Sequence, residues 1–418
     1  MAARPLGFSF AGKTILYPGG NIPSHKDALA FCRREETFGI PESITIEFAT
    51  PKELCVISSL DWQIVMPGET LQVQYRHPER VPFAGLDIPG VLVSRAKLVQ
   101  GIITRAETEC FLQIRGNPGS GKTVLLHLIQ QELMKDGKTI AERFDRPWPT
   151  NEDERYALYQ RIRTLQKESL KTNTRTVILI DEGQASYGDV MLWNSQFKIY
   201  AGHPFGPFNI IIACTYGISI SPEIMDPRIP YIRLGAKQNI GLRREEDPPG
   251  YRAENSDTPL AILFDNEELD ELYTLAVSAK ILPPIDEELK DAIFRWTGGY
   301  IAIVWVIVRM IKAAAGNNTD AYHLNQFMED HPGHICKALE ADAKCQNFLP
   351  TQALAVDPTL LPVFSQLLED GVIQYRYDRL PSAGESACKT GILYMEENCD
   401  RPLRITFVFP LQRELAQM

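Results

Sequence analysis

The chain has 418 residues, of which 44% are hydrophobic and 23% are charged, and this balance excludes an intrinsically disordered protein. Its formal net charge of -10 excludes a globally basic surface of the kind that attracts nucleic acid or anionic membranes. The most apolar run, residues 300–308, ends at Arg309 and is too short to cross a bilayer. Because no secretory leader is visible and the cysteines are scattered, we expect an intracellular protein, cytoplasmic or nuclear, with free thiols.

The first part of the chain is predicted to be rich in β-strands. A helical stretch interrupts a series of short strands, with Ser24 as its candidate N-cap, and the order reads β-β-α-β-β-β. In the last strand Leu71, Val73 and Tyr75 alternate with polar residues, as is typical of a half-buried strand. This order predicts a β-grasp, ubiquitin-like module over residues 1–78, which we expect to dock a protein partner.

A proline-containing linker is predicted at 79–92, followed by a P-loop NTPase core over residues 93–235. Apolar strands alternate with helices in this core, which predicts a parallel sheet covered on both faces, a three-layer α/β/α arrangement. The predicted strands are 110–115, 138–145, 176–181, 208–215 and 231–235, and the helices are 94–106, 122–137, 153–171 and 189–202. Strand 208–215 is expected to lie beside strand 176–181.

Two further modules are predicted in the last part of the chain. Residues 236–330 read as a helical lid, with helices at 266–280, 286–299 and 300–316. Residues 331–418 read as a winged-helix-like module, because helices are followed by a short β-ribbon.

Residues 115–124, RGNPGSGKTV, match the P-loop pattern G-x-x-x-x-G-K-[ST] between an apolar strand and a helix. Glycines allow such a loop to turn its N–H groups around a phosphate at the positive end of a helix dipole. The candidate binding residues are Gly116, Asn117, Pro118, Gly119, Ser120, Gly121, Lys122, Thr123 and Val124. Lys122 is expected to reach the β- and γ-phosphates of ATP, and the Thr123 hydroxyl is expected to bind Mg²⁺.

An acidic pair, Asp181 and Glu182, ends the apolar strand 176–181 about sixty residues further on. This is the Walker B arrangement, in which Asp181 holds Mg²⁺ through water and Glu182 polarises the attacking water. Thr215 at the end of the next strand is a candidate sensor of the γ-phosphate, and capping of its own turn is an equal alternative. Among Arg228, Arg233, Arg243 and Arg244, we favour Arg243 as a sensor or finger arginine.

The motifs IRGNPGSGKTVLL, VILIDEGQASYGDVMLWNSQFK and IIIACTYG resemble an expanded set of fungal P-loop proteins that are grouped with Crinkler-type or STAND-like ATPases. The segments GLR at 241–243 and TGGYIAIV at 297–304 are also similar to that family. The resemblance covers residues 90–418. It implies an additional-strand ATPase that works as an ATP-driven switch, with the lid and the C-terminal module clamping nucleotide and the N-terminal module signalling or recruiting.

Two alternatives stay open at this point. The chain could be a nucleotide-binding scaffold with negligible turnover, whose N-terminal and C-terminal modules contact protein partners, or a DNA-handling ATPase, which its acidic balance disfavours. ATP is preferred to GTP because of the family likeness and because no N-K-x-D guanine motif occurs. Nucleotide-dependent self-association is a further expectation.

Overall fold

The computed structural model divides into two compact units, Met1–Pro89 and Gly90–Met418. It describes residues 7–10, 13–16, 28, 30–32, 45–49, 56–57, 70–76, 91–135, 137–144, 148–149, 151–189, 191–198, 207–216, 234–247, 259–316, 320–331, 334–341, 349–375, 382–396 and 403–417. Within these residues no helix is both long and apolar enough to span a membrane.

The first unit contains a five-stranded mixed sheet. Its strands are β1 (Gly7–Phe10), β2 (Lys13–Leu16), β3 (Thr45–Ala49), β4 (Val56–Ile57) and β5 (Thr70–Arg76). The spatial order is β2-β1-β5-β3-β4, in which β1 pairs with β5 in parallel and every other pairing is antiparallel. The strands follow the expected sequence order, while the predicted boundary at residue 78 and residues 79–90 of the predicted linker 79–92 lie outside the described residues.

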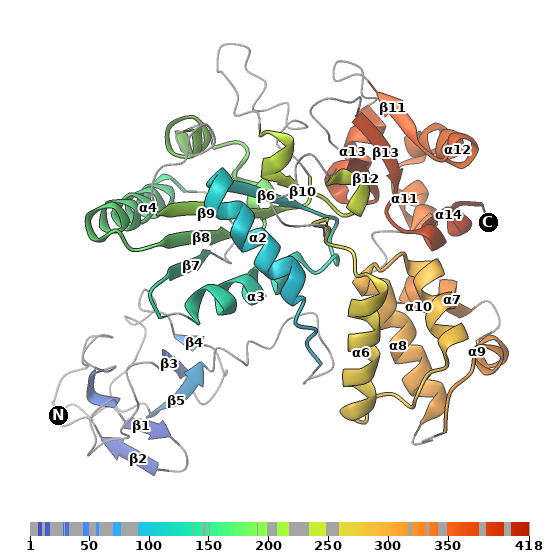
Figure 1. The fold of residues 1–418 in the computed structure, drawn as a ribbon, viewed down its shortest axis with the longest axis horizontal. Coiled ribbons are helices and arrows are strands. Elements are labelled where there is room, and N and C mark those ends of the chain that lie inside the picture. The colour runs from blue at the N-terminus through green and yellow to red at the C-terminus, as the bar shows by residue number, and fades with distance from the viewer. Residues whose placement is uncertain are drawn as a thin grey trace, which may run out of the picture. The chain divides into compact units, whose positions relative to one another are not determined.

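The second unit is built around a five-stranded parallel sheet (Figure 1). Its strands are β6 (Phe111–Arg115), β7 (Ile140–Phe144), β8 (Thr176–Ile180), β9 (Phe208–Cys214) and β10 (Asn239–Ile240). The order across the sheet is β10-β6-β9-β8-β7, so β9 lies between β6 and β8 and pairs with both. The predictions of a parallel sheet and of strand 208–215 beside strand 176–181 are therefore confirmed.

Helices cover both faces of this sheet. The helices are α2 (Ala96–Glu109), α3 (Lys122–Met134) and α4 (Glu152–Thr172), and a π-helix, Leu192–Phe197, takes the place of the helix predicted at 189–202. On one face α4 and the π-helix bury a cluster in which Trp193 and Phe197 pack edge-on, with ring centroids 5.1 Å apart. Helices α2 and α3 contact the opposite face (Figure 1). Because both faces are covered, every residue of β6, β8 and β9 is buried.

The edge of the sheet differs from the prediction. Residues 231–233 of the predicted strand 231–235 lie outside the described residues, while Leu234 and Gly235 are not in a strand and precede a short 3-10 turn; the edge strand of the described sheet is β10, Asn239–Ile240. A strand of two residues is too short to produce a recognisable apolar pattern in the sequence.

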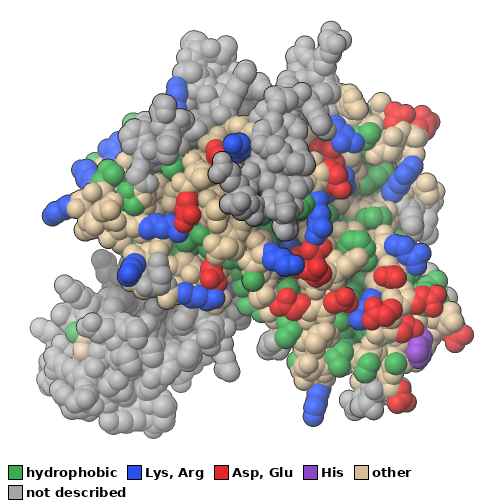
Figure 2. All heavy atoms as spheres, viewed as in Figure 1, with side chains coloured by type: hydrophobic (Ala, Val, Ile, Leu, Met, Phe, Trp, Pro, Cys, Tyr) green, Lys and Arg blue, Asp and Glu red, His purple; other side chains and the backbone are tan. Residues whose placement is uncertain are grey.

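A helical part follows the sheet. It comprises α6 (Asn266–Ser278), α7 (Glu287–Thr297), α8 (Ile301–Ala315), α9 (Leu324–Asp330) and α10 (His334–Ala341). Asp265 and Glu268 form a reciprocal capping box at the start of α6, and Gly298, at φ +58°, ends α7. Figure 2 shows acidic side chains concentrated over this part, and those exposed on α6 and α7 are Glu267, Asp270, Glu287, Glu288 and Asp291.

The C-terminal part combines helices with a small antiparallel sheet. Its helices are α11 (Pro350–Val356), α12 (Leu361–Asp370), α13 (Ser382–Thr390) and α14 (Pro410–Gln417), and its strands are β11 (Ile373–Tyr375), β12 (Leu393–Glu396) and β13 (Leu403–Phe407). The sheet order is β11-β13-β12. A separate apolar cluster that includes Phe364, Leu367 and Ile405 forms the core of this part.

Candidate functional site

The loop that joins β6 to α3 contains the predicted P-loop. Gly119 and Gly121 have φ of +81° and +93°, a region that favours glycine, and Gly121 directly precedes the first residue of α3. The loop is tied to the sheet because the Gly116 amide donates to the Cys214 carbonyl at the end of β9. The glycines therefore permit a turn that ends at the N-terminus of a buried helix, where an anion is stabilised.

Lys122 is the first residue of α3, and its side chain is almost completely buried. Its ammonium donates to the carbonyl oxygens of Gly116, at 2.5 Å, and of Asn117, at 3.1 Å, so it lies within the loop. Burial lowers the pKa of Lys122, and the carboxylates of Glu182 and Asp181 counteract this effect. A phosphate in the loop would give the ammonium an anionic partner in place of neutral carbonyls.

Two polar atoms inside the loop are buried without a hydrogen-bond partner, the Ser120 hydroxyl and the Asn117 side-chain oxygen. A Cβ at Gly116 would lie 2.6 Å from the Ser120 hydroxyl oxygen, so only glycine leaves this hydroxyl its space. Buried polar atoms without partners are unfavourable and are typical of sites that bind a polar ligand. The hydroxyl, the glycine backbone and Lys122 together match the needs of a phosphate group.

The acidic pair lies at the carboxyl end of β8. Asp181 is 7% exposed, and its carboxylate faces the guanidinium of Arg143 at 3.9 Å. Glu182 is exposed and has a left-handed backbone, with φ of +50°, and its amide donates to the Asp181 carboxylate at 3.0 Å. The predicted metal ligand Thr123 is in the first turn of α3 and is exposed. Thr123 and Asp181 are an oxygen donor set of the kind that Mg²⁺ uses together with water and phosphate.

A glutamine that sequence reasoning did not assign to the site joins two of the predicted residues. The Gln184 side-chain oxygen accepts from the Thr215 backbone amide at 3.0 Å, and its amide nitrogen donates to the Glu182 carboxylate at 2.5 Å. Thr215 is 8% exposed and directly follows β9. The motif Asp-Glu-Gly-Gln shows the glutamine, but only the fold reveals that its side chain reaches the neighbouring strand.

The helical part and the C-terminal part both contact the P-loop. The Asn117 side chain donates to the carbonyl oxygens of Gly391 and Leu393, at 2.7 and 3.1 Å, and the Tyr300 hydroxyl donates to the Pro118 carbonyl. A Cβ at Gly391 would lie 2.4 Å from Pro118 Cδ, so the turn before β12 packs directly on the loop. Access to the loop therefore depends on the position of the C-terminal part.

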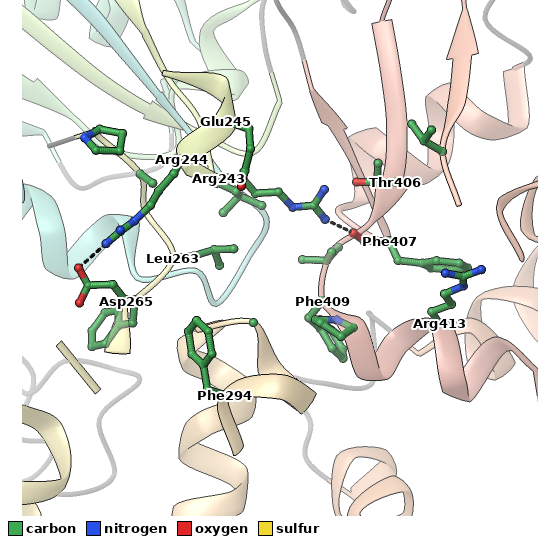
Figure 3. Close-up of a pocket in the computed structure, with 18 of the residues that line it drawn as sticks. Arg243, Arg244, Glu245, Leu263, Asp265, Phe294, Thr406, Phe407, Phe409 and Arg413 are labelled. Atoms are coloured by element: carbon green, nitrogen blue, oxygen red, sulfur yellow. Dashed lines mark hydrogen bonds and ion pairs between the residues drawn. The ribbon is translucent and has the colours of Figure 1, made fainter. Parts of the chain in front are cut away.

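Arg243 faces the C-terminal sheet. Its guanidinium pairs with Glu396 at 2.8 Å. It also donates to the Phe407 carbonyl at 2.6 Å, as Figure 3 shows. It therefore connects the core to β12 and β13, and its predicted role as a sensor arginine stays a prediction. Arg244 pairs with Asp265, while Arg228 and Arg233 lie outside the described residues.

A buried polar network lies behind the loop. Arg115, the last residue of β6, faces the Glu246 carboxylate at 3.6 Å, and the Tyr394 hydroxyl donates to that carboxylate and accepts from the Leu242 amide. Burial raises the pKa of Glu246, and Arg115 and Tyr394 act in the opposite direction. The strand that precedes the P-loop is thus tied to β12 by charged and polar groups.

A cavity of about 1070 Å³ lies among the core, the helical part and the C-terminal part (Figure 3). Apolar, cationic and acidic side chains line it together, among them Leu263, Phe294, Arg243, Arg413, Glu245 and Asp265. None of its described lining residues belongs to the loop 116–123. The cavity and the P-loop are therefore separate features of this unit.

Several solved structures match the chain distantly. No family model matches the chain, and no curated protein matches it. A Thermotoga maritima RuvB mutant is 15% identical with a TM-score of 0.31, and 66% of this chain covers 75% of that chain. Cdc6p from Pyrobaculum aerophilum is 14% identical with a TM-score of 0.31, with coverage of 82% and 96%. A chain of Drosophila ORC bound to DNA is 10% identical with a TM-score of 0.33, with coverage of 81% and 90%. At these values the matches define neither a ligand nor a reaction for this chain.

Proposed function

We propose that the chain binds ATP with Mg²⁺, hydrolyses it, and acts as a nucleotide-driven regulatory switch. One observation carries this proposal: the glycine loop with buried Lys122 follows β6, and the acidic pair Asp181 and Glu182 ends β8, two strands away on the same edge of one parallel sheet. Ligands of open α/β sheets bind at the carboxyl ends of the strands. The same edge therefore offers both a phosphate cradle and the carboxylates that hydrolysis needs.

Each residue has a proposed task. The loop amides and Lys122 hold the phosphates, while Thr123 and Asp181 provide oxygen ligands for Mg²⁺, which would neutralise charge on the β- and γ-phosphates. Glu182 accepts a proton from the attacking water. Its carboxylate counteracts the effect of burial on the pKa of Lys122. Thr215 is proposed to sense the γ-phosphate from the end of β9.

The contacts on the P-loop support the switch. Asn117 and Pro118 of the loop interact with Gly391 of the C-terminal part and with Tyr300 of the helical part. A change in the loop on phosphate binding or release therefore acts directly on the groups that hold these parts in place. The sheet order in Met1–Pro89 supports a β-grasp docking module, and the order β11-β13-β12 supports a winged-helix-like module, each as a contact surface for a protein partner.

Nucleotide binding and hydrolysis can be tested separately. We expect Lys122→Ala to weaken ATP binding by about tenfold or more, because it removes the ammonium group proposed to pair with the β- and γ-phosphates. Lys135→Ala is the matched control, since Lys135 is exposed at the end of α3. Glu182→Gln should retain ATP binding and lose phosphate release. Equal ATP binding by the parent and the Lys122→Ala protein would refute the site.

A nucleotide-binding scaffold with negligible turnover is the second candidate. The burial of Lys122 and the packing of Gly391 on Pro118 favour it, because both would slow exchange. It predicts that nucleotide co-purifies with the protein, detectable by mass spectrometry, and that the parent and Glu182→Gln release phosphate equally slowly. A faster parent would favour the switch ATPase.

A further inference from the structure

Gln184 occupies a turn that the sheet holds in place. The turn, Gly183–Ser186, directly follows Glu182, and a Cβ at Gly183 would lie 2.2 Å from the Ile212 side chain of β9. The Ser186 hydroxyl donates to the Gly183 carbonyl, and the Trp193 indole donates to the Ser186 carbonyl. Since Ser186 and Trp193 are buried, the backbone of this turn is fixed against the central strand.

The Gln184 side-chain amide forms one hydrogen bond to a buried backbone group and one to an exposed side chain. Its oxygen accepts from the Thr215 backbone amide at 3.0 Å, at a buried position at the end of β9. Its nitrogen donates to the Glu182 carboxylate, at 2.5 Å. The Gln184 side-chain amide therefore links the backbone at the end of β9 to the carboxylate of exposed Glu182.

Glu182 needs such support. Its side chain is exposed and its backbone is left-handed, a conformation that is unfavourable for a non-glycine residue. An exposed glutamate has several rotamers of similar energy, and only those that direct its carboxylate toward the P-loop can serve the attacking water. A hydrogen bond from a fixed amide selects among these rotamers.

We propose that Gln184 is a positioning residue that holds the Glu182 carboxylate in the orientation required for water activation, with the Thr215 backbone as its reference point. The inference rests on the proposed ATPase function and adds a residue that acts through Glu182. It does not require Gln184 to contact nucleotide.

Two substitutions separate the two hydrogen bonds. Gln184→Met removes both, whereas Gln184→Glu keeps an acceptor for the Thr215 amide and loses the donor to Glu182. We expect kcat for phosphate release to fall about tenfold or more in both variants, with KM and ATP affinity within about twofold of the parent. Gln366→Met, an exposed position on α12, is the control and should behave like the parent.

Retention of the parent kcat by Gln184→Glu would overturn the inference, because a structural role requires only the bond to Thr215. A fall in kcat has to occur in both variants to support positioning, because Gln184→Glu also brings a second carboxylate beside Glu182. This variant keeps the test valid even if Gln184→Met folds poorly, which a thermal unfolding scan would reveal.

A double variant separates this inference from the proposed function. Because Gln184 acts through Glu182, Glu182→Gln combined with Gln184→Met should be no slower than Glu182→Gln alone. If Glu182→Gln is slow and both Gln184 variants match the parent, the positioning inference fails and the ATPase proposal stands. If Glu182→Gln matches the parent, both fail.

Discussion

Asn117, in the P-loop, donates a 2.7 Å hydrogen bond to the carbonyl oxygen of Gly391, which lies in the turn before β12. The Asn117 amide and the Gly391 carbonyl are both buried, so water cannot readily replace either group in this hydrogen bond. The same turn packs on Pro118. The loop and the C-terminal part are therefore one structural unit at this point, and a change in either one affects the other.

The packing of Gly391 on the loop predicts an effect of a single added methyl group. In Gly391→Ala the new Cβ would meet Pro118 Cδ at 2.4 Å, so we expect the C-terminal part to shift away from the loop and bound nucleotide to dissociate several-fold faster. Stopped-flow dissociation of a fluorescent ATP analogue measures this rate.

Gly371→Ala is a matched control for that substitution. Gly371 also has a positive φ, +72° against +82° at Gly391, so both alanines carry similar backbone strain of about 1 kcal/mol. No atom lies within 4 Å of a Cβ at Gly371. Equal dissociation rates for the two variants would show that strain, rather than contact with Pro118, determines the result.

Arg243→Ala should loosen the C-terminal sheet. The substitution removes an ion pair to Glu396 and a hydrogen bond to the Phe407 carbonyl. Because the Arg243 side chain is 27% exposed, we expect a loss on the order of 1 kcal/mol, which raises the opening equilibrium of β12 and β13 about fivefold. Hydrogen exchange of these strands measures the change. Arg413→Ala is the control, since Arg413 donates to Leu368 within the C-terminal part, and an equal effect there would argue against a specific role for Arg243.

The raised pKa of Glu246 predicts a pH-dependent contribution to stability. A carboxyl whose pKa is higher in the folded than in the unfolded protein binds more protons when folded, so its contribution falls as pH rises from about 4.5, its ordinary value, through the raised pKa. Glu246→Gln cannot titrate and lacks this dependence. The stability advantage of the parent over Glu246→Gln should therefore shrink with rising pH, as measured by denaturant unfolding between about pH 4.5 and pH 7. An advantage that grows over this range would contradict the assignment.

Local sequence patterns were sufficient to predict the centre of this fold. The strands 110–115, 176–181 and 208–215 consist mainly of apolar residues, because helices cover both faces of the sheet and most strand side chains are buried against them. The positions of Lys122 and of the acidic pair relative to the sheet follow from the same runs, since each motif directly adjoins one. Their chemical roles stay predictions.

Contacts between distant segments could not be predicted in this way. Asn117 and Gly391 are 274 residues apart, and Arg243 and Glu396 are 153 residues apart, so no period or motif links them. The role of Gln184 was missed for a related reason, because its second partner is a backbone amide, and a backbone amide carries no sequence signal. Edge strand β10 was missed because its two residues leave too short a pattern.

The position of β9 between β6 and β8 sets the distance between the glycine turn and the acidic pair. Two inter-strand steps of about 4.8 Å separate the backbone that carries the glycine turn from the backbone that carries the acids, a gap of about 10 Å. A gap of this width accommodates a hydrated cation and a terminal phosphoryl group side by side, whereas adjacent strands would halve it. In the proposed site β9 would thus act as a spacer, and changes in its bulk or twist would alter the distance between the glycine loop and the acidic pair without replacing any residue of either.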